Sequence, residues 1–297
     1  MLRPLGGVER SSSPRHYLMC PPTWFDVSYA INPWMHPGLP VDRPRALAQW
    51  SALVATYRAA GHRVDLLEPV EGLPDLVYAA NGATVVDGHV LQARFARPER
   101  AAEASLHGAW HRRRLAALPD PGVVTLPGAV NEGEGDFAVL ADRVLAGYGF
   151  RTSPAAHAEL ARLTGREVIS LELVDPYCYH LDVALAVLDD RRDHIAYHPP
   201  AFAPESRRRL AELFPDAVLA SAADVARFGL NCVSDGRTVW VPAGAAQLVA
   251  ALREHGYAPV EIDLGELHRG GGSVKCCTQE IRPAHPGPAP TEGHHPC

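Results

Sequence analysis

Apolar runs occur in pairs along this chain, and a tight polar turn separates the two members of each pair. ATVV and HVLQARF flank Asp87-Gly88, and NCVS and RTVWVP flank Asp235-Gly236. Asp-Gly between two apolar runs is a strong signal for a β-hairpin. Two further pairs of runs turn at Ala141-Asp142 and near Asp189. The pattern therefore predicts four hairpins.

A helix candidate and then a short apolar strand follow each of the four hairpins. These helix and strand pairs are 98–118 with 122–126, 153–165 with 167–173, 204–214 with 216–220, and 244–256 with 258–264. The two ends of the chain supply the parts of a fifth unit, with strands in 16–27, 62–69 and 273–282 and a helix at 43–60. A repeat of roughly 50 residues indicates radially arranged units, not an open sheet.

Hairpins also recur by chance in α/β domains of this size, but the placement of polar residues favours true repeats. Asn81, Asp136, His180 and Asn231 precede their hairpin turns by six, five, nine and four residues. Side chains capable of chemistry thus have a similar phase in each unit. In a radial array that phase faces a common centre.

Composition excludes several classes of function. With 297 residues and 47% hydrophobic residues, the chain is long and apolar enough for a packed core. Its net charge of −6, from 28 basic and 34 acidic residues, argues against a nucleic acid partner. No run reaches the roughly 20 apolar residues of a membrane helix, and the N-terminus has no apolar signal core, so we expect a cytoplasmic protein with no membrane partner.

The six cysteines include no CxxC pair, so neither a disulfide framework nor a structural zinc site is expected. Residues 1–14 and 283–297 lack apolar periodicity and are expected to be mobile tails around a single domain at 15–282. His294, His295 and Cys297 in the second tail could bind a metal adventitiously, but a solvated tail is the simpler interpretation.

The strongest local motif is Gly270-Gly271-Gly272-Ser273-Val274-Lys275-Cys276-Cys277-Thr278. Glycines let a backbone approach a ligand closely, and the loop delivers a cysteine near the end of the last repeat. A cysteine with an ordinary pKa of about 8.5 is mostly protonated at pH 7, so a nucleophile here needs a cationic substrate or a protonated histidine beside it. A buried structural cysteine is the alternative.

Two further motifs are weaker taken alone. If His180-Leu181-Asp182 begins the third hairpin as a strand, alternation places the imidazole and the carboxylate on one face, where one moves protons and the other binds a cation. Surface or capping roles are equally open to them. Asn131-Glu132-Gly133-Glu134-Gly135-Asp136 reads as a turn or a weak metal loop.

Together these motifs resemble the guanidino-group-modifying (amidinotransferase/deiminase, pentein) superfamily. The resemblance covers about residues 15–282 and is carried by GGGSVKCCT, by HLD at 180–182, by EGEGD at 132–136 and by FRTS at 150–153. It implies a five-bladed, pseudo-symmetric α/β propeller, in agreement with the counted repeats. It also implies Cys276 as the nucleophile and His180 as the acid/base, with Cys277 at a neighbouring variable position.

The resemblance further implies how a substrate is held. Glu132 and Asp182 bracket a guanidinium, although the extra residue in EGEGD leaves open whether Glu132 or Glu134 makes the contact. Asn81 stands where deiminases usually carry aspartate, which either permits a second round of hydrolysis or is a neutral change in the pocket. Other implied contacts are Asn32 for the guanidinium, in a segment similar to the start of bacterial arginine dihydrolases, and Arg94 with Arg151 for the α-carboxylate.

The implied reaction cleaves C–N bonds of arginine or a methylated arginine through an amidino-cysteine intermediate, with no metal and no organic cofactor. Its products are citrulline and ammonia or a methylamine, or ornithine after a second cycle. Amidino transfer to an acceptor amine is an alternative, as is a non-catalytic binding module on the same fold. The expected partner is the small-molecule substrate, and self-association into a homo-oligomer is left open.

Overall fold

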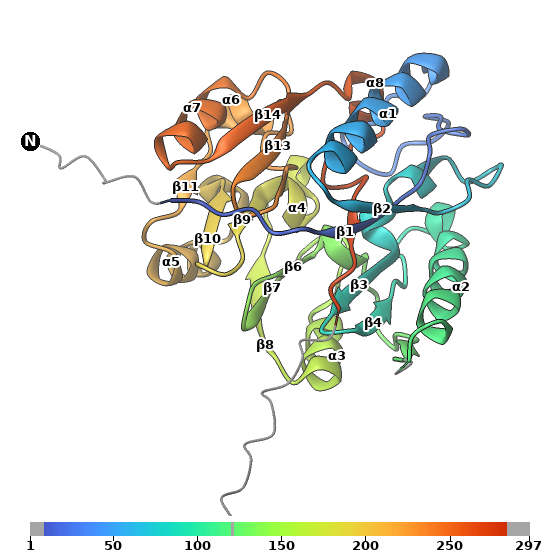
Figure 1. Cartoon of the computed structure of the whole chain (residues 1–297), viewed down its shortest axis with the longest axis horizontal. Coiled ribbons are helices and arrows are strands. Elements are labelled where there is room, and N and C mark those ends of the chain that lie inside the picture. The colour runs from blue at the N-terminus through green and yellow to red at the C-terminus, as the bar shows by residue number, and fades with distance from the viewer. Residues whose placement is uncertain (1–8, 120–121, 284–297) are drawn as a thin grey trace, which may run out of the picture.

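The computed structural model describes residues 9–119 and 122–283, and within them five three-stranded sheets are arranged around a common centre (Figure 1). In chain order the first four sheets contain β3 (Ala83–Val86), β4 (His89–Gln92) and β5 (Val124–Thr125); β6 (Phe137–Val139), β7 (Arg143–Tyr148) and β8 (Glu167–Glu172); β9 (Leu185–Asp189), β10 (His194–Tyr197) and β11 (Val218–Leu219); and β12 (Val233–Ser234), β13 (Thr238–Pro242) and β14 (Ala258–Ile262).

Every one of these sheets pairs its first two strands antiparallel and its second and third strands parallel. A parallel pair requires a crossover, and a helix provides it in each case. The crossover helices are α2 (Glu103–Ala116), α3 (Pro154–Thr164), α5 (Pro204–Leu213) and α7 (Ala246–Glu254). The first hairpin turns through Asp87 at φ 49° and Gly88 at φ 80°, a turn that asparagine, aspartate and glycine favour. The four predicted hairpin units are confirmed.

The two ends of the chain form the fifth sheet. Its strands are β15 (Gln279–Glu280), β1 (His16–Met19) and β2 (Arg63–Leu66), and helix α1 (Arg43–Ala59) crosses between β1 and β2. Leu18 in the central strand pairs antiparallel with Gln279 and parallel with Asp65. The prediction that both ends complete a fifth unit is therefore confirmed, and the last strand closes the ring.

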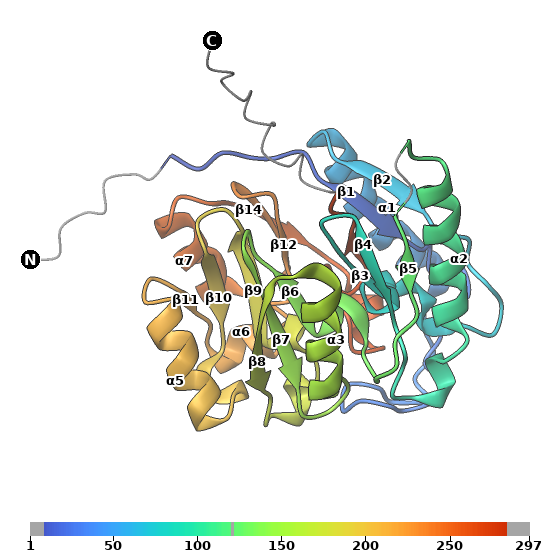
Figure 2. The same cartoon turned by 90° about the horizontal axis from the view of Figure 1, so that it is seen from below.

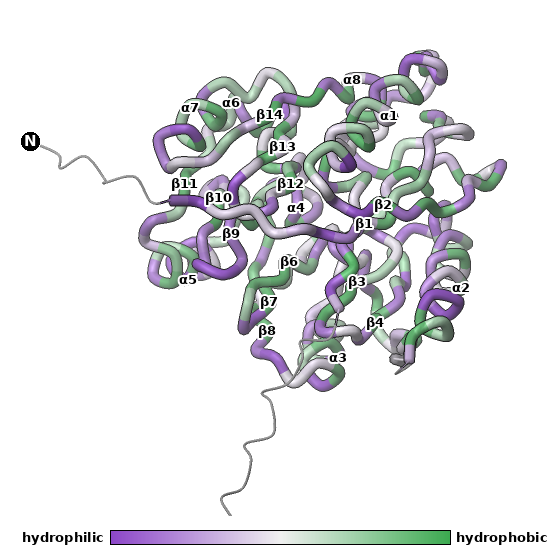
Figure 3. The backbone as a smooth tube through the Cα atoms, viewed as in Figure 1, coloured by the Kyte–Doolittle hydropathy of each residue, from purple (hydrophilic) through white to green (hydrophobic). Residues whose placement is uncertain are grey.

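The helices lie on the outer sides of their sheets (Figure 2). On α1 the covering side chains are Trp50, Leu53 and Tyr57, which are buried against the fifth sheet and its neighbours. The backbone along β3, β6 and β7 consists largely of hydrophobic residues, whereas the outer turns of α2 and α5 are hydrophilic (Figure 3). This layering places the apolar core between sheets and helices and leaves the polar strand entrances at the centre.

Short helices also occur between these longer elements. They are α4 (Leu181–Ala184), α6 (Ala222–Val225), α8 (Gly265–His268) and the 3₁₀ helices η1 (Pro74–Val77), η2 (Ala79–Gly82), η3 (Pro98–Arg100), η4 (Gly133–Gly135), η5 (Pro176–Cys178) and η6 (Pro199–Ala201). The strand predicted through His180 and Asp182 is wrong. His180 is the extended N-cap of α4 and Asp182 lies in its first turn, because the chain turns from η5 directly into a single helical turn.

The segment 9–14, assigned to the N-terminal tail, contacts the folded chain. The Arg10 guanidinium lies 3.2 Å from Asp189, and the Ser13 amide donates to the Asp235 carbonyl at 2.9 Å. Residues 1–8 and 284–297, with the histidines and the cysteine of the second tail, lie outside the described residues. Among the helices that the structure describes, none has the length and apolarity to cross a membrane.

Candidate active site

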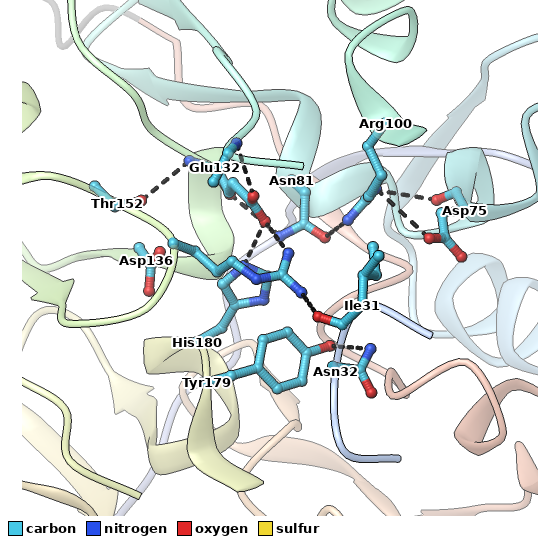
Figure 4. A network of polar contacts seen from close by, with 12 residues as sticks. Ile31, Asn32, Asp75, Asn81, Arg100, Glu132, Asp136, Thr152, Tyr179 and His180 are labelled. Carbon is cyan, nitrogen blue, oxygen red and sulfur yellow. Dashed lines mark hydrogen bonds and ion pairs between the residues drawn. The ribbon is translucent and has the colours of Figure 1, made fainter. Parts of the chain in front are cut away.

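Polar residues from the entrances of different sheets meet at the centre of the ring (Figure 4). Asn81 belongs to η2, Glu132 is the N-cap of η4, and His180 is the N-cap of α4. Hydrogen bonds link the Asn81 amide to the Glu132 carbonyl at 3.2 Å and the His180 imidazole to the Glu132 carboxylate at 2.8 Å. Asn81 and His180, which the hairpin spacing predicted to face a common centre, are thus both hydrogen-bonded to Glu132.

The glycine-rich loop brings Cys276 to this centre. Gly271 has a φ of 86°, and a Cβ there would stand 2.6 Å from the Asn32 side chain. A Cβ on Gly270 would stand 2.2 Å from the Tyr78 hydroxyl. The loop can therefore pack this closely only without side chains at those positions. Cys276 is buried, and its thiol donates to a carboxylate oxygen of Asp182 at 3.2 Å.

Burial favours the protonated forms of both the thiol and the carboxylate beside it. Burial raises the pKa of Cys276 well above its ordinary value, and the charge of Asp182 raises it further. Burial also raises the pKa of Asp182 to about 7, because hydrogen bonds from Cys276 and Asn231 only partly offset the loss of solvent. One oxygen of Asp182, Oδ1, has no hydrogen-bond partner among the described residues. This pair is therefore suited to receive a cation.

His180 and Glu132 form the second half of the site with Arg151. The same Glu132 oxygen, Oε2, accepts from His180 Nε2 and from Arg151 at 2.8 Å each. Burial opposes ionisation of Glu132, but the His180 hydrogen bond and the Arg151 charge outweigh it and lower its pKa to about 2. Glu132 is therefore ionised. The other imidazole nitrogen, His180 Nδ1, has no partner among the described residues.

Glu134 lies in a different environment from Glu132, although only one glycine separates them. Its carboxylate forms ion pairs with Lys275 and Arg282 and accepts the Glu280 amide at 3.0 Å. These cations lower the pKa of Glu134 despite its burial. Glu132 thus contacts His180, whereas Glu134 ties the loop that carries Lys275 to Arg282.

Arg100 is a member of this cluster that the sequence did not reveal. Its guanidinium donates to the Asn81 oxygen at 2.8 Å and pairs with Glu103 at 2.8 Å, and both charged side chains are buried. Arg94, for which binding of a carboxylate stays a prediction, is exposed, and one of its nitrogens donates to the Gly128 carbonyl at 2.6 Å. The segment LQARFARPER offers three arginines, and no sequence signal separates the one that turns inward at η3.

Asn32 and Tyr179 also belong to this cluster. The Asn32 amide donates to the Gly270 carbonyl at 3.1 Å and to the Tyr179 hydroxyl at 3.4 Å. Tyr179 in turn donates to the Gly271 carbonyl at 2.8 Å, and the Arg151 guanidinium lies 4.8 Å from the centre of its ring. Asn32 therefore touches the glycine-rich loop, and Tyr179 is a second residue that the sequence did not single out.

The arrangement combines a thiol, an imidazole and two carboxylates in a buried centre. Within the part of the chain that the structure describes, no group of three histidine, cysteine or acidic residues has the spacing to hold a metal ion. A thiol next to a carboxylate, with a histidine that has one free nitrogen, suits nucleophilic attack on a cationic carbon followed by proton transfer.

Sequence comparison identifies relatives that extend over most of the chain, although no family model matches it. The N(G),N(G)-dimethylarginine dimethylaminohydrolase of Mycobacterium tuberculosis is 52% identical over 276 residues, which are 93% of this chain and 89% of that protein. The bifunctional arginine dihydrolase/ornithine cyclodeaminase ArgZ of Synechocystis sp. is 34% identical over 89% of this chain, which spans 37% of that protein.

Solved structures show the same architecture. The N-terminal domain of ArgZ, a cysteine-to-serine mutant bound to substrate, matches with a TM-score of 0.85 at 31% identity and covers 91% of this chain and 98% of that domain. A dimethylarginine dimethylaminohydrolase of Pseudomonas aeruginosa, a cysteine-to-serine mutant complexed with citrulline, matches in fold with a TM-score of 0.75 at 20% identity, over 90% of this chain and 99% of that one. The predicted five-unit α/β propeller is confirmed.

Proposed function

Because the chain belongs to the guanidino-group-modifying superfamily of dimethylarginine dimethylaminohydrolase and the arginine dihydrolases, we propose that it hydrolyses guanidinium C–N bonds of arginine or an Nω-methylated arginine. The observation that carries the proposal is the buried contact between the Cys276 thiol and the Asp182 carboxylate, with His180 on the adjacent turn. A planar cation held by Asp182 has its central carbon next to the sulfur. Glu132, ionised and hydrogen-bonded to His180, supplies the second carboxylate.

The reaction proceeds in two halves at the guanidinium carbon. The bound cation favours ionisation of Cys276, whose proton passes to His180, and the sulfur then forms a bond to the carbon and gives a tetrahedral adduct. The leaving nitrogen takes a proton from His180 and departs as ammonia or a methylamine, which leaves an amidino-thioether. His180 then accepts a proton from water, the hydroxide attacks the same carbon, and the C–S bond breaks with return of the thiolate. Nδ1, which has no protein partner in the described residues, is the nitrogen suited to this proton transfer.

Arg151 is the residue we assign to the substrate α-carboxylate. It is buried beside Glu132, and among the described residues its guanidinium donates only to Glu132 and to the Ile31 carbonyl. A carboxylate that meets an arginine in such a site forms charge-assisted, bidentate hydrogen bonds. Of the other two arginines discussed, Arg94 is exposed and Arg100 is buried within the cluster. We assign Arg100 to orienting Asn81, because its NH1 donates to the Asn81 oxygen.

Asn81 decides how far the reaction goes. Its oxygen accepts from Arg100 and its nitrogen donates to the Glu132 carbonyl, so the amide presents no negative charge to the substrate. A neutral side chain favours a cation over neutral urea less strongly than aspartate does. Citrulline can then bind again and undergo a second cycle to ornithine. Dimethylarginine hydrolysis to citrulline is the second candidate, favoured by the activity named for the relative that is 52% identical.

The test is a product analysis with arginine, Nω,Nω-dimethylarginine and citrulline as separate substrates. We expect ornithine and two ammonia per arginine from the wild type, and citrulline as the end product from Asn81→Asp. Cys276→Ser is the control for contaminating activity. Dimethylamine and citrulline from dimethylarginine, without ornithine from any substrate, would establish the second candidate. No product unless an acceptor amine is added would show amidino transfer and refute hydrolysis.

A further inference from the structure

Asn231 stands at the entrance of the fourth sheet and contacts the nucleophile directly. It precedes β12, its side chain is completely buried, and its phase matches that of Asn81 and His180 in their own units. Neither the sequence pattern nor the resemblance assigned it a function. Its contacts with the loop of Cys276 are more extensive than those of any other side chain described above.

The oxygen atoms of Asn231 hold the backbone of the nucleophile loop. The side-chain oxygen, Oδ1, accepts from the amides of Ser273 and Cys276 at 3.1 Å each. Its main-chain oxygen accepts from the Lys275 amide at 3.0 Å. Three donors of one four-residue segment therefore converge on one residue of a neighbouring unit, which fixes the position of the Cys276 backbone.

The side-chain nitrogen of Asn231 faces the sulfur. Nδ2 donates to Cys276 Sγ at 3.1 Å and to the Asp182 carbonyl at 3.1 Å. The orientation of this amide is determined by its partners, because the opposite face meets two backbone N–H groups that only an oxygen can accept. A hydrogen-bond donor is therefore fixed against the sulfur before any substrate arrives.

We propose that Asn231 is a catalytic residue that stabilises the thiolate of Cys276 by hydrogen bonding. This inference rests on the proposed function, in which the thiolate forms twice, once for attack and once as the group expelled by water. A neutral donor binds a thiolate more strongly than a thiol, because the hydrogen bond becomes charge-assisted. The amide thus favours the ionised sulfur in both halves of the reaction without adding a charge to the buried site.

The other groups that face the sulfur act mainly in the opposite direction. Burial and Asp182 on α4 raise the pKa of Cys276, as does the buried Cys277, whereas a backbone hydrogen bond at Ser273 lowers it. Two buried phenols, Tyr78 and Tyr179, lie within electrostatic range and are neutral, because burial raises the pKa of each well above its ordinary value. The remaining charges nearby are Lys275, which pairs with Glu134, and His180, which donates to Glu132. Asn231 is therefore the side-chain donor placed to favour the thiolate.

The test measures the rate at which iodoacetamide alkylates Cys276 as a function of pH, by mass spectrometry of the peptide that contains it. Asn231→Asp keeps the oxygen that accepts from the loop, but it replaces the donor with an acidic oxygen. Asn231→Ala removes the donor without adding charge. We expect the alkylation pKa to rise by about one to two pH units in both variants, the size of a lost charge-assisted hydrogen bond, and kcat to fall roughly 10- to 100-fold.

Cys232→Ser is the matched control, because it alters the next residue of the same strand entrance without touching the sulfur of Cys276. Its alkylation pKa should equal that of the wild type. If Asn231→Asp does not fold, Asn231→Ala still decides the question. An alkylation pKa unchanged in the folded variants, with activity lost, would show that Asn231 only holds the loop and would overturn the proposal. Since alkylation needs no substrate, this result is independent of whether the wild type hydrolyses arginine.

Discussion

Replacing Asp182 by asparagine is expected to stabilise the protein while it removes the activity. The folded chain holds the Asp182 proton until its pKa of about 7, whereas the unfolded chain loses it near the ordinary value of 3.8. Between these values the folded state binds more protons, so the stability contributed by protonated Asp182 is lost as the pH rises through this window. At 1.36 kcal/mol per pH unit, the ionised carboxylate costs about 4 kcal/mol above pH 7. Asparagine has no such ionisation.

Urea unfolding at pH 5 and at pH 8, under reducing conditions, measures this difference. We expect the free energy of unfolding of Asp182→Asn to exceed that of wild type by about 3 kcal/mol more at pH 8 than at pH 5. Asp142→Asn is the control, because Asp142 is exposed and its pKa is lowered, so that it is ionised at both pH values. If Asp182→Asn changes the free energy of unfolding by the same amount at both pH values, burial does not raise the pKa of Asp182.

Three further outcomes are expected. Cys276→Ser should abolish turnover with the fold preserved, whereas Cys277→Ser should change kcat little. Steady-state assays and thermal unfolding measure both effects. The reverse ranking of the two variants would show that Cys277, not Cys276, is the nucleophile. Arg151→Met should raise KM for arginine more than for an alkylguanidine without a carboxylate, with a loss of roughly 1.5–3 kcal/mol of binding free energy. Arg94→Met should behave like wild type. Equal losses on both substrates would show that Arg151 has a structural role. Gly271→Ala should lower activity and stability, because its φ of 86° disfavours a side chain, and wild-type values in both measurements would show that the loop adapts.

The repeat architecture could be predicted because its signals are local. Asp87-Gly88 and Asp235-Gly236 specify tight turns through backbone preferences that are independent of the rest of the fold. The regular spacing then placed Asn81, His180 and Asn231 at corresponding positions, and the structure brings all three to one centre. The fifth sheet was predictable for the same reason, since its parts follow the pattern of the other four in circular order.

The local structure around the site could not be read from the sequence in the same way. His180-Leu181-Asp182 alternates like a strand, but the tertiary contacts of Leu181 and Asp182 hold this segment in one helical turn. Selection between Arg94 and Arg100 depends on η3, which turns Arg100 toward the buried partner Glu103. The turn at His180 is held by a contact between units, whereas the Arg100–Glu103 pair is local and becomes decisive only once the fold buries both side chains.

The pairing of β1 with both β2 and β15 has a consequence for the order of events during synthesis. β1 emerges from the ribosome early and pairs with β2 soon afterwards, but its other edge stays unpaired until β15 is made, about 260 residues later. Cys276 lies three residues before β15. Closure of the ring and arrival of Cys276 therefore coincide, and a nascent chain has neither until β15 is made.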